Sequence, residues 1–390
     1  MGEIDPKGGR VSVPLYSTQP ATNNRFLGTF TFEYIVTTPL SHPLRNLPTK
    51  TAFEWAPNGK TTLVGHRGLG MNLDAQQKCG QVLQLGENTI ASFAKAHELG
   101  AHFVEFDTQV SKDGVVLLYH DNVLDETGFH VEINDLTEQE FRALKPKFAV
   151  SAREYPETID RATTLRRARS TGNLVALAPL PSEITGTKKA KRPWKGNYVG
   201  CIQEPFTTLK EALQTLPTSL GFNIEIKYPL PDEIEREGLK SFEANRFVDA
   251  ILNTVLDHAG DERAIIFSCF NAEAARMAKL KQSRYPVLFL TMGGTHETID
   301  TRLNSVQAAA RFASRFGLDG IVTSAAPVLA DLALIARAKE VMRGGRALVL
   351  TYGGLNCVKG NAKRLMWAGL DGIIVDTVRQ VREELDAAGR

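Results

Sequence analysis

The chain has 390 residues, 43% of them hydrophobic, which is enough to form one large domain or two of ordinary size. This composition excludes an intrinsically disordered chain. The 46 basic and 44 acidic side chains leave a formal charge of +2, so no overall field points to nucleic acid or to an anionic membrane. We expect neither as a partner, and any site for an anion must be local.

Cysteine usage and hydropathy indicate the compartment. The four cysteines lie far apart and form no metal-binding spacing, a pattern typical of free thiols in a reducing compartment. No stretch reaches the roughly 18 consecutive apolar residues of a membrane span, and residues 1–17 lack the apolar core of a signal peptide. We therefore expect a cytoplasmic protein without stable membrane insertion.

The first 60 residues differ from the rest of the chain. Apolar and polar or small side chains alternate from residue 30 to residue 36, which predicts one half-buried strand. Three prolines between residues 39 and 48 then predict a linker. Because a single strand is not stable alone, we expect this N-terminal extension to pack on the following domain or to belong to a larger β domain.

From residue 61 onward, short apolar runs alternate with longer amphipathic segments, which is typical of βαβ units. Strands are predicted at residues 61–66, 103–108, 222–227, 264–268, 287–291, 320–324, 347–352 and 372–376. Helices are predicted at residues 88–99, 207–216, 241–258, 272–281, 301–316, 327–343, 356–368 and 378–387. Eight strands, each followed by a helix, predict an α/β fold, a TIM (β/α)8 barrel over residues 61–390. A doubly wound open sheet is the alternative that strand counting leaves open.

An insertion over residues 109–201 separates the second and third barrel strands. It begins with a turn at residues 111–114 and a return strand at 115–120. Residues 161–195 contain nine Lys or Arg and a single acid, which predicts a surface loop. Within that loop, residues 166–170 (RRARS) match the substrates of basophilic kinases, although a plain solvated loop is the simpler interpretation.

Carboxylates lie on the second and third predicted strands. Glu105 and Asp107 are two residues apart on a strand, so both side chains point to the same side. They would raise each other's pKa unless a cation lay between them. Glu225, at the end of the next strand, is the expected third ligand, and three carboxylates suit Mg²⁺ or Ca²⁺ better than zinc. The alternative, a solvated acidic face, fits poorly with the apolar neighbours Phe103 and Phe106.

Two histidines end predicted strands, His66 on the first barrel strand and His120 on the return strand of the insertion. Phosphodiester cleavage needs a base for the attacking oxygen and an acid for the leaving alkoxide, and two imidazoles can divide these roles near neutral pH. A lone histidine at a strand end is more often structural. Two of them beside an acidic pair favour catalysis.

Three further side chains are candidates around these groups. The planar guanidinium of Arg67 can bind a phosphate oxygen, and Lys227 adds a point charge. An ion pair with Glu105 or Asp107 is the alternative for Lys227. Glu87 would orient Arg67 or His66, unless it is an ordinary carboxylate at a helix start.

Together these motifs resemble the glycerophosphodiester phosphodiesterase family. The matching segments, in order, are residues 65–68 (GHRG), 87–89 (ENT), 105–107 (EFD), 112–114 (KDG), 120–121 (HD) and 225–227 (EIK). The resemblance covers about residues 61–380. It implies a TIM barrel with an insertion after the second strand, the three carboxylates as metal ligands, the two histidines as acid and base, and Arg67 as a phosphate contact.

Finer features resemble the fungal cytosolic branch of this family, which acts on glycerophosphocholine. They are residues 68–70, 85–89, 203–209, 223–229 and 287–291. The resemblance implies the catalytic C-terminal portion of that branch, without its phosphate-sensing and ankyrin regions. It further implies metal-dependent hydrolysis of glycerophosphocholine to glycerol 3-phosphate and the free alcohol, with water or the glycerol 2-hydroxyl as nucleophile. A lysophospholipase D-like enzyme and a non-catalytic phosphate-signalling barrel are the alternatives.

The end of the seventh barrel strand departs from the family pattern. Many bacterial members have a Trp there, whereas residues 351–356 of this chain read TYGGLN. Tyr352 is therefore the expected aromatic wall of the substrate pocket. Aromatic faces attract a choline ammonium, and Tyr352, Phe270 and Phe289 are candidates by position.

Overall fold

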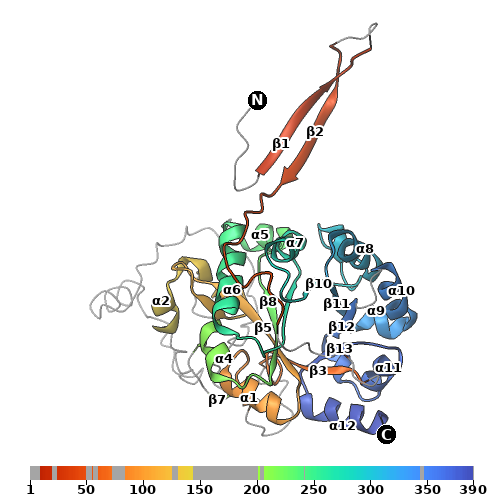
Figure 1. Cartoon of the computed structure of the whole chain (residues 1–390). Coiled ribbons are helices and arrows are strands. Elements are labelled where there is room, and N and C mark those ends of the chain that lie inside the picture. Colours follow the sequence, from red (N-terminus) through yellow and green to blue (C-terminus); the bar gives the residue numbers. More distant parts are fainter. Residues whose placement is uncertain are drawn as a thin grey trace, which may run out of the picture.

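The protein forms a closed parallel barrel. The structure, a computed structural model, describes residues 9–19, 24–49, 55, 60–72, 84–124, 131–143, 201–202, 206–240, 242–342 and 347–389. The eight barrel strands are β3 (Thr62–His66), β5 (Phe103–Val110), β8 (Gly221–Ile226), β9 (Ile265–Cys269), β10 (Val287–Thr291), β11 (Gly320–Ser324), β12 (Leu348–Tyr352) and β13 (Gly372–Val375). Because β3 pairs with both β13 and β5, the sheet closes on itself (Figure 1). The predicted TIM barrel is confirmed, and the open-sheet alternative is wrong.

Helices surround the barrel. They are α1 (Ile90–Glu98), α4 (Leu209–Thr215), α5 (Pro231–Glu237), α6 (Ala244–His258), α7 (Ala272–Lys281), α8 (Val306–Phe316), α9 (Ala325–Ala330), α10 (Ala333–Val341), α11 (Asn361–Trp367) and α12 (Val378–Ala388). Among the described residues, no helix has both the length and the apolar character that crossing a membrane requires.

Two helices predicted as continuous are divided. Residues 301–316 form the 3-10 turn η5 (Thr301–Leu303) and then α8, because Ser305 Oγ accepts the Ala308 amide at 3.0 Å and starts a new helix. Residues 327–343 divide between α9 and α10, where Asp331 Oδ1 accepts the Ala333 amide at 3.1 Å. Residues 356–368 likewise divide between η6 (Gly354–Cys357) and α11.

Strand side chains alternate between two apolar environments. On β5, Val104 and Phe106 belong to the large cluster that includes the surrounding helices, whereas Phe103 belongs to a second cluster of buried strand side chains. This second cluster is the barrel interior, filled by residues from opposite strands. Since side chains two apart share a face, Glu105 and Asp107 also project into the interior.

The insertion begins as predicted. Strand β6 (Val116–Leu118) returns antiparallel to β5 after a turn in which Gly114 has a φ of +86°. It continues into η4 (Ile133–Asp135) and α2 (Glu138–Ala143), and Tyr119, Phe141 and Phe206 form a small separate core. The short strands β4 (Gln84–Leu85) and β7 (Cys201–Ile202) pair with each other. The basic segment 161–195, with its kinase motif, lies outside the described residues.

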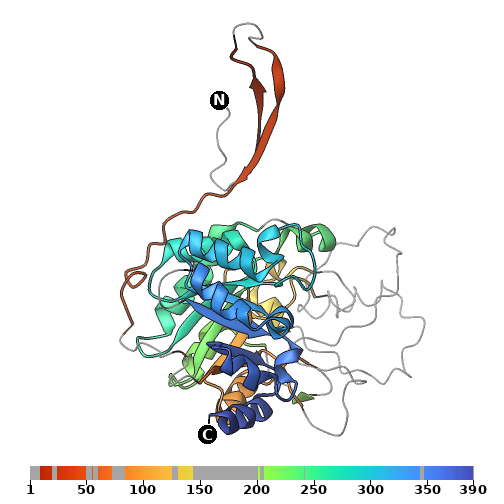
Figure 2. The same ribbon diagram turned by 90° about the vertical axis from the view of Figure 1, so that its right-hand side faces the viewer.

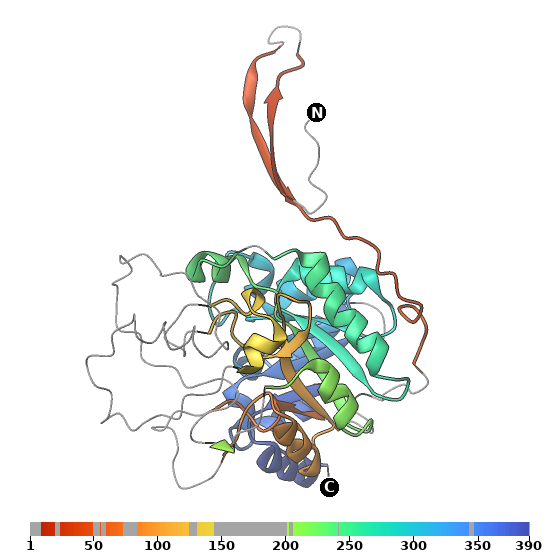
Figure 3. The same ribbon diagram turned by 90° about the vertical axis from the view of Figure 1, so that its left-hand side faces the viewer.

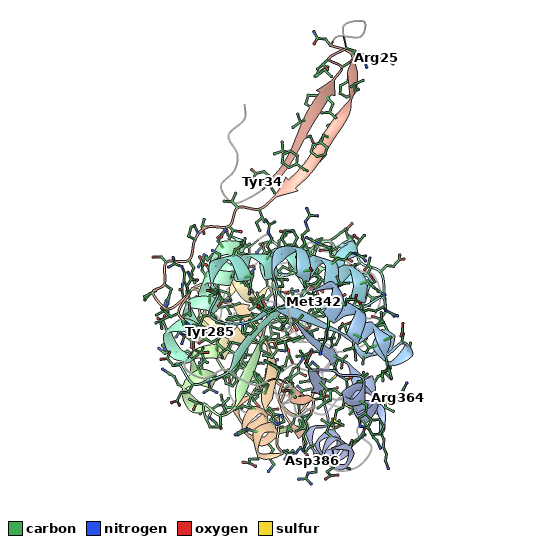
Figure 4. The ribbon with its side chains drawn as sticks, turned by 45° about the vertical axis from the view of Figure 1, so that its right-hand side comes forward. Arg25, Tyr34, Tyr285, Met342, Arg364 and Asp386 are labelled. Carbon is green, nitrogen blue, oxygen red and sulfur yellow. The ribbon has the colours of Figure 1, made fainter. Side chains whose placement is uncertain are left out.

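The N-terminal extension contains a hairpin rather than one strand. Strands β1 (Gly9–Tyr16) and β2 (Phe26–Tyr34) pair antiparallel and stand away from the barrel in every view (Figures 1, 2 and 3). Arg25 lies near the far tip and Tyr34 at the base (Figure 4). The alternation in β1 was not recognised because Pro14 interrupts it. The expected half-burial is also wrong, since Phe30 is 56% exposed.

The hairpin has one apolar face. Val13 lies opposite Phe30, while Ser12 and Thr31 share a hydrogen bond of 2.8 Å on the other face. Exposed apolar surface of this kind favours self-association. We expect the double variant Phe30→Ser, Phe32→Ser to reduce concentration-dependent association in light scattering without changing the barrel's melting temperature. The matched control alters the polar face, Ser12→Ala with Thr31→Ala. Equal association of both variants would contradict the prediction.

The segment predicted as a linker is bonded to the barrel. The Thr38 amide and hydroxyl donate to Asn245 Oδ1 at 2.8 and 3.0 Å, and Lys281 Nζ donates to the Thr38 carbonyl at 2.6 Å. Arg284 Nη1 donates to the Leu47 carbonyl at 2.8 Å. Helices α6 and α7 and the loop after α7 therefore hold Thr38 and Leu47 against the barrel.

His102 makes the barrel sensitive to acid. Its Nδ1 accepts the Leu63 amide at 3.1 Å, which requires an unprotonated nitrogen. Partial desolvation of the ring and the positive charge of Arg382 lower the His102 pKa below its usual 6.5. The unfolded chain therefore binds this proton at higher pH than the folded chain, so the His102 contribution is present above pH 6.5 and declines as the pH falls through the window below it.

This gives a testable pH dependence. Between pH 7 and pH 5, we expect the free energy of unfolding to fall more in the parent protein than in His102→Asn, whose side-chain oxygen accepts the same amide but does not titrate. Urea unfolding of both proteins at each pH measures the difference. Parallel pH profiles would refute a role for His102.

Candidate active site

Three buried carboxylates meet at the carboxyl ends of β5 and β8. One oxygen each from Glu105, Asp107 and Glu225 lies within 4.8 Å of the other two. The strand register explains the convergence, because Asp107 pairs with Glu225 across the β5–β8 ladder. The structure thus brings together the three residues that the sequence singled out as metal ligands.

The electrostatics of this cluster favour a cation. Burial, with the negative charge of Asp107, raises the pKa of Glu105 to about 8, and burial also raises the pKa of Glu225. Burial also acts to raise the pKa of Asp107. Arg67 and the other positive groups around Asp107 outweigh burial, so its pKa lies below the usual value. Two of the three carboxyl groups are therefore harder to ionise than usual, and a bound cation would favour their ionised forms. Oxygen ligands of this kind fit a hard divalent ion.

Arg67 lies against the cluster and is held from behind by Glu87. Its Nη1 donates to Glu87 Oε1 at 2.9 Å, and its Nε lies 3.1 Å from Asp107 Oδ2. Glu87 is fixed in turn by Asn72, whose backbone amide donates to Glu87 Oε2 at 2.6 Å. Glu87 was proposed to orient Arg67 or His66, and in the structure it contacts Arg67. It precedes the α1 cap and is not part of the helix start.

The helix predicted to begin at residue 88 begins at Ile90, so Asn88 lies outside it. Thr89 caps α1 by accepting the Ser92 amide at 3.3 Å. Asn88 instead has a φ of +57°, a conformation in which Asn is enriched. Its Nδ2 donates to Asp107 Oδ2 at 3.1 Å. The carboxylate therefore has an amide partner that the helix pattern concealed.

His66 is oriented by a residue that the sequence did not reveal. Its Nδ1 lies 2.7 Å from Asp376 Oδ1, just beyond β13, and its Nε2 lies 3.9 Å from Glu105 Oε2. Burial and Arg67 lower the pKa of His66, but the hydrogen bond to Asp376 and the nearby carboxylates raise it more. With Nδ1 engaged, Nε2 faces the carboxylate cluster.

His120 has a similar arrangement on the insertion. Its Nδ1 pairs with Asp121 Oδ1, and Gln109 Nε2 donates to the Asp121 carbonyl at 3.3 Å. The Tyr119 amide donates to the Asp107 carbonyl at 3.1 Å, which ties this segment to the barrel strand. Both predicted histidines thus have a carboxylate on Nδ1.

Lys227, the remaining polar candidate, directly follows β8. Lys227 Nζ is 3.0 Å from Glu225 Oε1 and 3.9 Å from Asp107 Oδ1. The ion-pair alternative is therefore present, with Glu225 as its main partner. These two carboxylates also raise the pKa of Lys227 above its usual value, although burial acts to lower it.

The aromatic candidates have different positions. Tyr352 packs edge-on against Phe270, with ring centroids 5.9 Å apart, and both border the barrel interior. The Tyr352 hydroxyl donates to the Thr291 carbonyl at 3.2 Å. Phe289 is wrong as a pocket residue, because it is fully buried against Phe312 of α8.

Comparison with known proteins identifies the family. Residues 66–380 match the Glycerophosphoryl diester phosphodiesterase family. The chain belongs to this family. The phosphodiesterase match begins at His66 and includes every carboxylate, histidine and cation of the candidate site.

Individual phosphodiesterases of the family show the extent of the likeness. Glycerophosphocholine phosphodiesterase GDE1 of Candida albicans is 35% identical over 390 residues, 96% of this chain and 32% of the relative. Glycerophosphodiester phosphodiesterase GDPD1, chloroplastic, of Arabidopsis thaliana is 33% identical over 331 residues, 84% of this chain and 81% of the relative. The chain spans about a third of the length of the fungal relatives.

A solved phosphodiesterase structure shares the fold. The crystal structure of a glycerophosphoryl diester phosphodiesterase from Silicibacter pomeroyi DSS-3 superposes with a TM-score of 0.54 at 18% identity. It covers 89% of this chain and 96% of its own.

Proposed function

We propose that residues 61–390 hydrolyse glycerophosphodiesters, with glycerophosphocholine as the preferred substrate and glycerol 3-phosphate and choline as products. The observation that carries this proposal is the pair of histidines, each held by a carboxylate on Nδ1, beside three buried carboxylates. Membership of the phosphodiesterase family supports the reaction class. The fungal relatives, named for glycerophosphocholine, support the substrate.

The carboxylates Glu105, Asp107 and Glu225 would hold Mg²⁺ or Ca²⁺. The donor set fits such an ion, because all three are buried oxygen ligands and their mutual repulsion lacks full compensation. When bound, the ion would act as a Lewis acid toward the phosphate.

Arg67 and Lys227 would bind the phosphate oxygens. Glu87 fixes the Arg67 guanidinium before substrate arrives, which lowers the entropic cost of orienting it. The rings of Tyr352 and Phe270 would form the wall that receives the choline ammonium.

His66 and His120 would share the proton transfers. One imidazole accepts the proton of the attacking water as its oxygen bonds to phosphorus, and the other donates a proton to the choline oxygen as the P–O bond breaks. Attack by the glycerol 2-hydroxyl would use the same two groups. Asp376 and Asp121 occupy Nδ1 of each ring, so Nε2 is the atom that exchanges the proton.

A cytoplasmic location is part of the same proposal. Among the described residues, Cys269 and Cys357 are free thiols, as expected in a reducing compartment. The glycerophosphodiester is proposed as the small-molecule partner.

A panel of substrates tests the proposed function. Purified protein would be assayed with Mg²⁺ or Ca²⁺ on glycerophosphocholine, glycerophosphoethanolamine and lysophosphatidylcholine. We expect glycerol 3-phosphate from the first, at a higher kcat/KM than from the second. Faster choline release from lysophosphatidylcholine would favour the lysophospholipase D alternative. No turnover of any diester would favour a non-catalytic barrel.

A further inference from the structure

Asn223 is a fully buried polar residue inside the barrel that the proposed chemistry does not use. Phe222 and Ile224 face the helices, so Asn223 and Glu225 project into the interior. Asn223 Oδ1 accepts the Ser268 hydroxyl at 2.9 Å. Its Nδ2 is buried and has no hydrogen-bond partner among the described residues. Such orphaned donors are rare in folded proteins and call for an explanation.

The neighbouring carboxylate Glu105 has one oxygen that accepts no hydrogen bond from the described residues. The register places it between His66 on β3 and Asn223 on β8. Its Oε2 accepts the Arg67 amide at 3.2 Å and is the oxygen nearest His66, so it faces the β3 side. Within the described part of the chain, no hydrogen bond reaches Oε1. An unused donor and an unused acceptor therefore occupy laterally paired positions.

We propose that Asn223 is a positioning residue, whose Nδ2 donates to Glu105 Oε1 and fixes that carboxylate in the orientation that binds a divalent cation. This inference rests on the proposed metal site. Hydrogen bonds to metal-ligating carboxylates commonly hold the ligand in place and tune its affinity. Glu105 would then be held from both sides, by the Arg67 amide from β3 and by Asn223 from β8.

The surroundings select the orientation of the amide. Reversing it would leave Oδ1 facing Glu105, and two acceptors would then meet whenever a bound cation keeps that carboxylate ionised. In the observed orientation the Ser268 hydroxyl, on the next strand, donates to Oδ1, so Nδ2 is left to donate to Glu105. Ser268 therefore supports the orientation without supplying the donor to Glu105.

Metal titration tests the proposal directly. The dissociation constants of Mg²⁺ and Ca²⁺ would be measured by calorimetry on the parent chain, Asn223→Leu and the control Ser268→Ala. We expect Asn223→Leu to bind about tenfold more weakly, while Ser268→Ala, which keeps the donor, changes far less. In chelator, Asn223→Leu should melt no lower than Ser268→Ala, because both variants lose the hydrogen bond between Asn223 Oδ1 and the Ser268 hydroxyl, and the donor that only Asn223→Leu removes has no partner without metal. Asn223→Ala repeats both measurements with a smaller side chain.

The outcomes separate this inference from the proposed function. If the parent binds neither ion, the proposed metal site fails and the inference fails with it. If the parent binds and both Asn223 variants bind equally well, only the inference is overturned. It is also overturned if both variants melt well below Ser268→Ala in chelator, since that result assigns the Asn223 amide to the fold alone.

Discussion

Replacing His66 or His120 by alanine should lower the kcat for glycerophosphocholine by about 10²- to 10⁴-fold, because each substitution removes one partner of the proton transfer. Both histidines are partly exposed at the barrel mouth, so their removal leaves little cavity. We therefore expect the melting temperature to change by no more than a few degrees. Initial rates of glycerol 3-phosphate release, with melting curves on the same samples, check both expectations.

A histidine outside the site supplies the control. His258 is the last residue of α6, remote from the carboxylates, and His258→Ala should retain the parent's kcat. A His66→Ala or His120→Ala protein that kept more than a tenth of the activity would exclude the two-histidine mechanism. Asp376→Asn provides a graded intermediate, because it keeps His66 in place but weakens the charge that favours its protonated form.

The second large effect concerns the carboxylate cluster, where activity and stability should change in opposite directions. Glu105→Gln replaces one of three carboxyl groups that lie within 4.8 Å of one another by a neutral amide, so the metal-free fold no longer has to protonate or ionise a buried carboxyl there. We expect it to reduce turnover by at least about 100-fold while stabilising the metal-free protein by about 1–2 kcal/mol, since functional sites commonly sacrifice stability. Chelator should abolish the parent's activity, and added Mg²⁺ or Ca²⁺ should restore it.

The comparison requires a buried glutamate outside the cluster. Glu132 accepts the Lys240 amide at 3.2 Å, so Glu132→Gln should lose some stability and keep its activity. Urea unfolding in chelator, paired with rate measurements in metal, gives both quantities. Full turnover by Glu105→Gln, or full turnover of the parent in chelator, would rule out the proposed metal chemistry.

The barrel and the centre of its site could be predicted because both depend on local pattern. Apolar runs mark the strands, and carboxyl ends of parallel strands meet at one edge, so Glu105, Asp107 and Glu225 were expected to converge. Asp376 could not be predicted as the partner of His66. It is an ordinary residue after the last strand, and only closure of the barrel by the pairing of β13 with β3 brings it near His66. Asn88 was missed for the opposite reason, since its local pattern indicates a helix cap.

Errors at the edges of the fold also have physical causes. The strand β1 was hidden by Pro14, and its pairing with β2 depends on contacts between strands rather than on local pattern. Helices predicted as continuous were divided by caps such as Ser305, whose hydroxyl competes for backbone amides. Neither the strand pairing nor the helix caps change the spacing of hydrophobic residues, so that spacing could not reveal them.

Closure of the barrel has a consequence for biosynthesis. Asp376 and His66 are 310 positions apart in the chain, yet they form one hydrogen-bonded pair. Translation delivers the three clustered carboxylates and both imidazoles long before it delivers β13, which must pair with β3 to complete the barrel. A nascent chain halted before Asp376 would carry all three proposed metal ligands but an unoriented His66. The order of synthesis thus reserves full catalytic competence for chains translated at least through that residue.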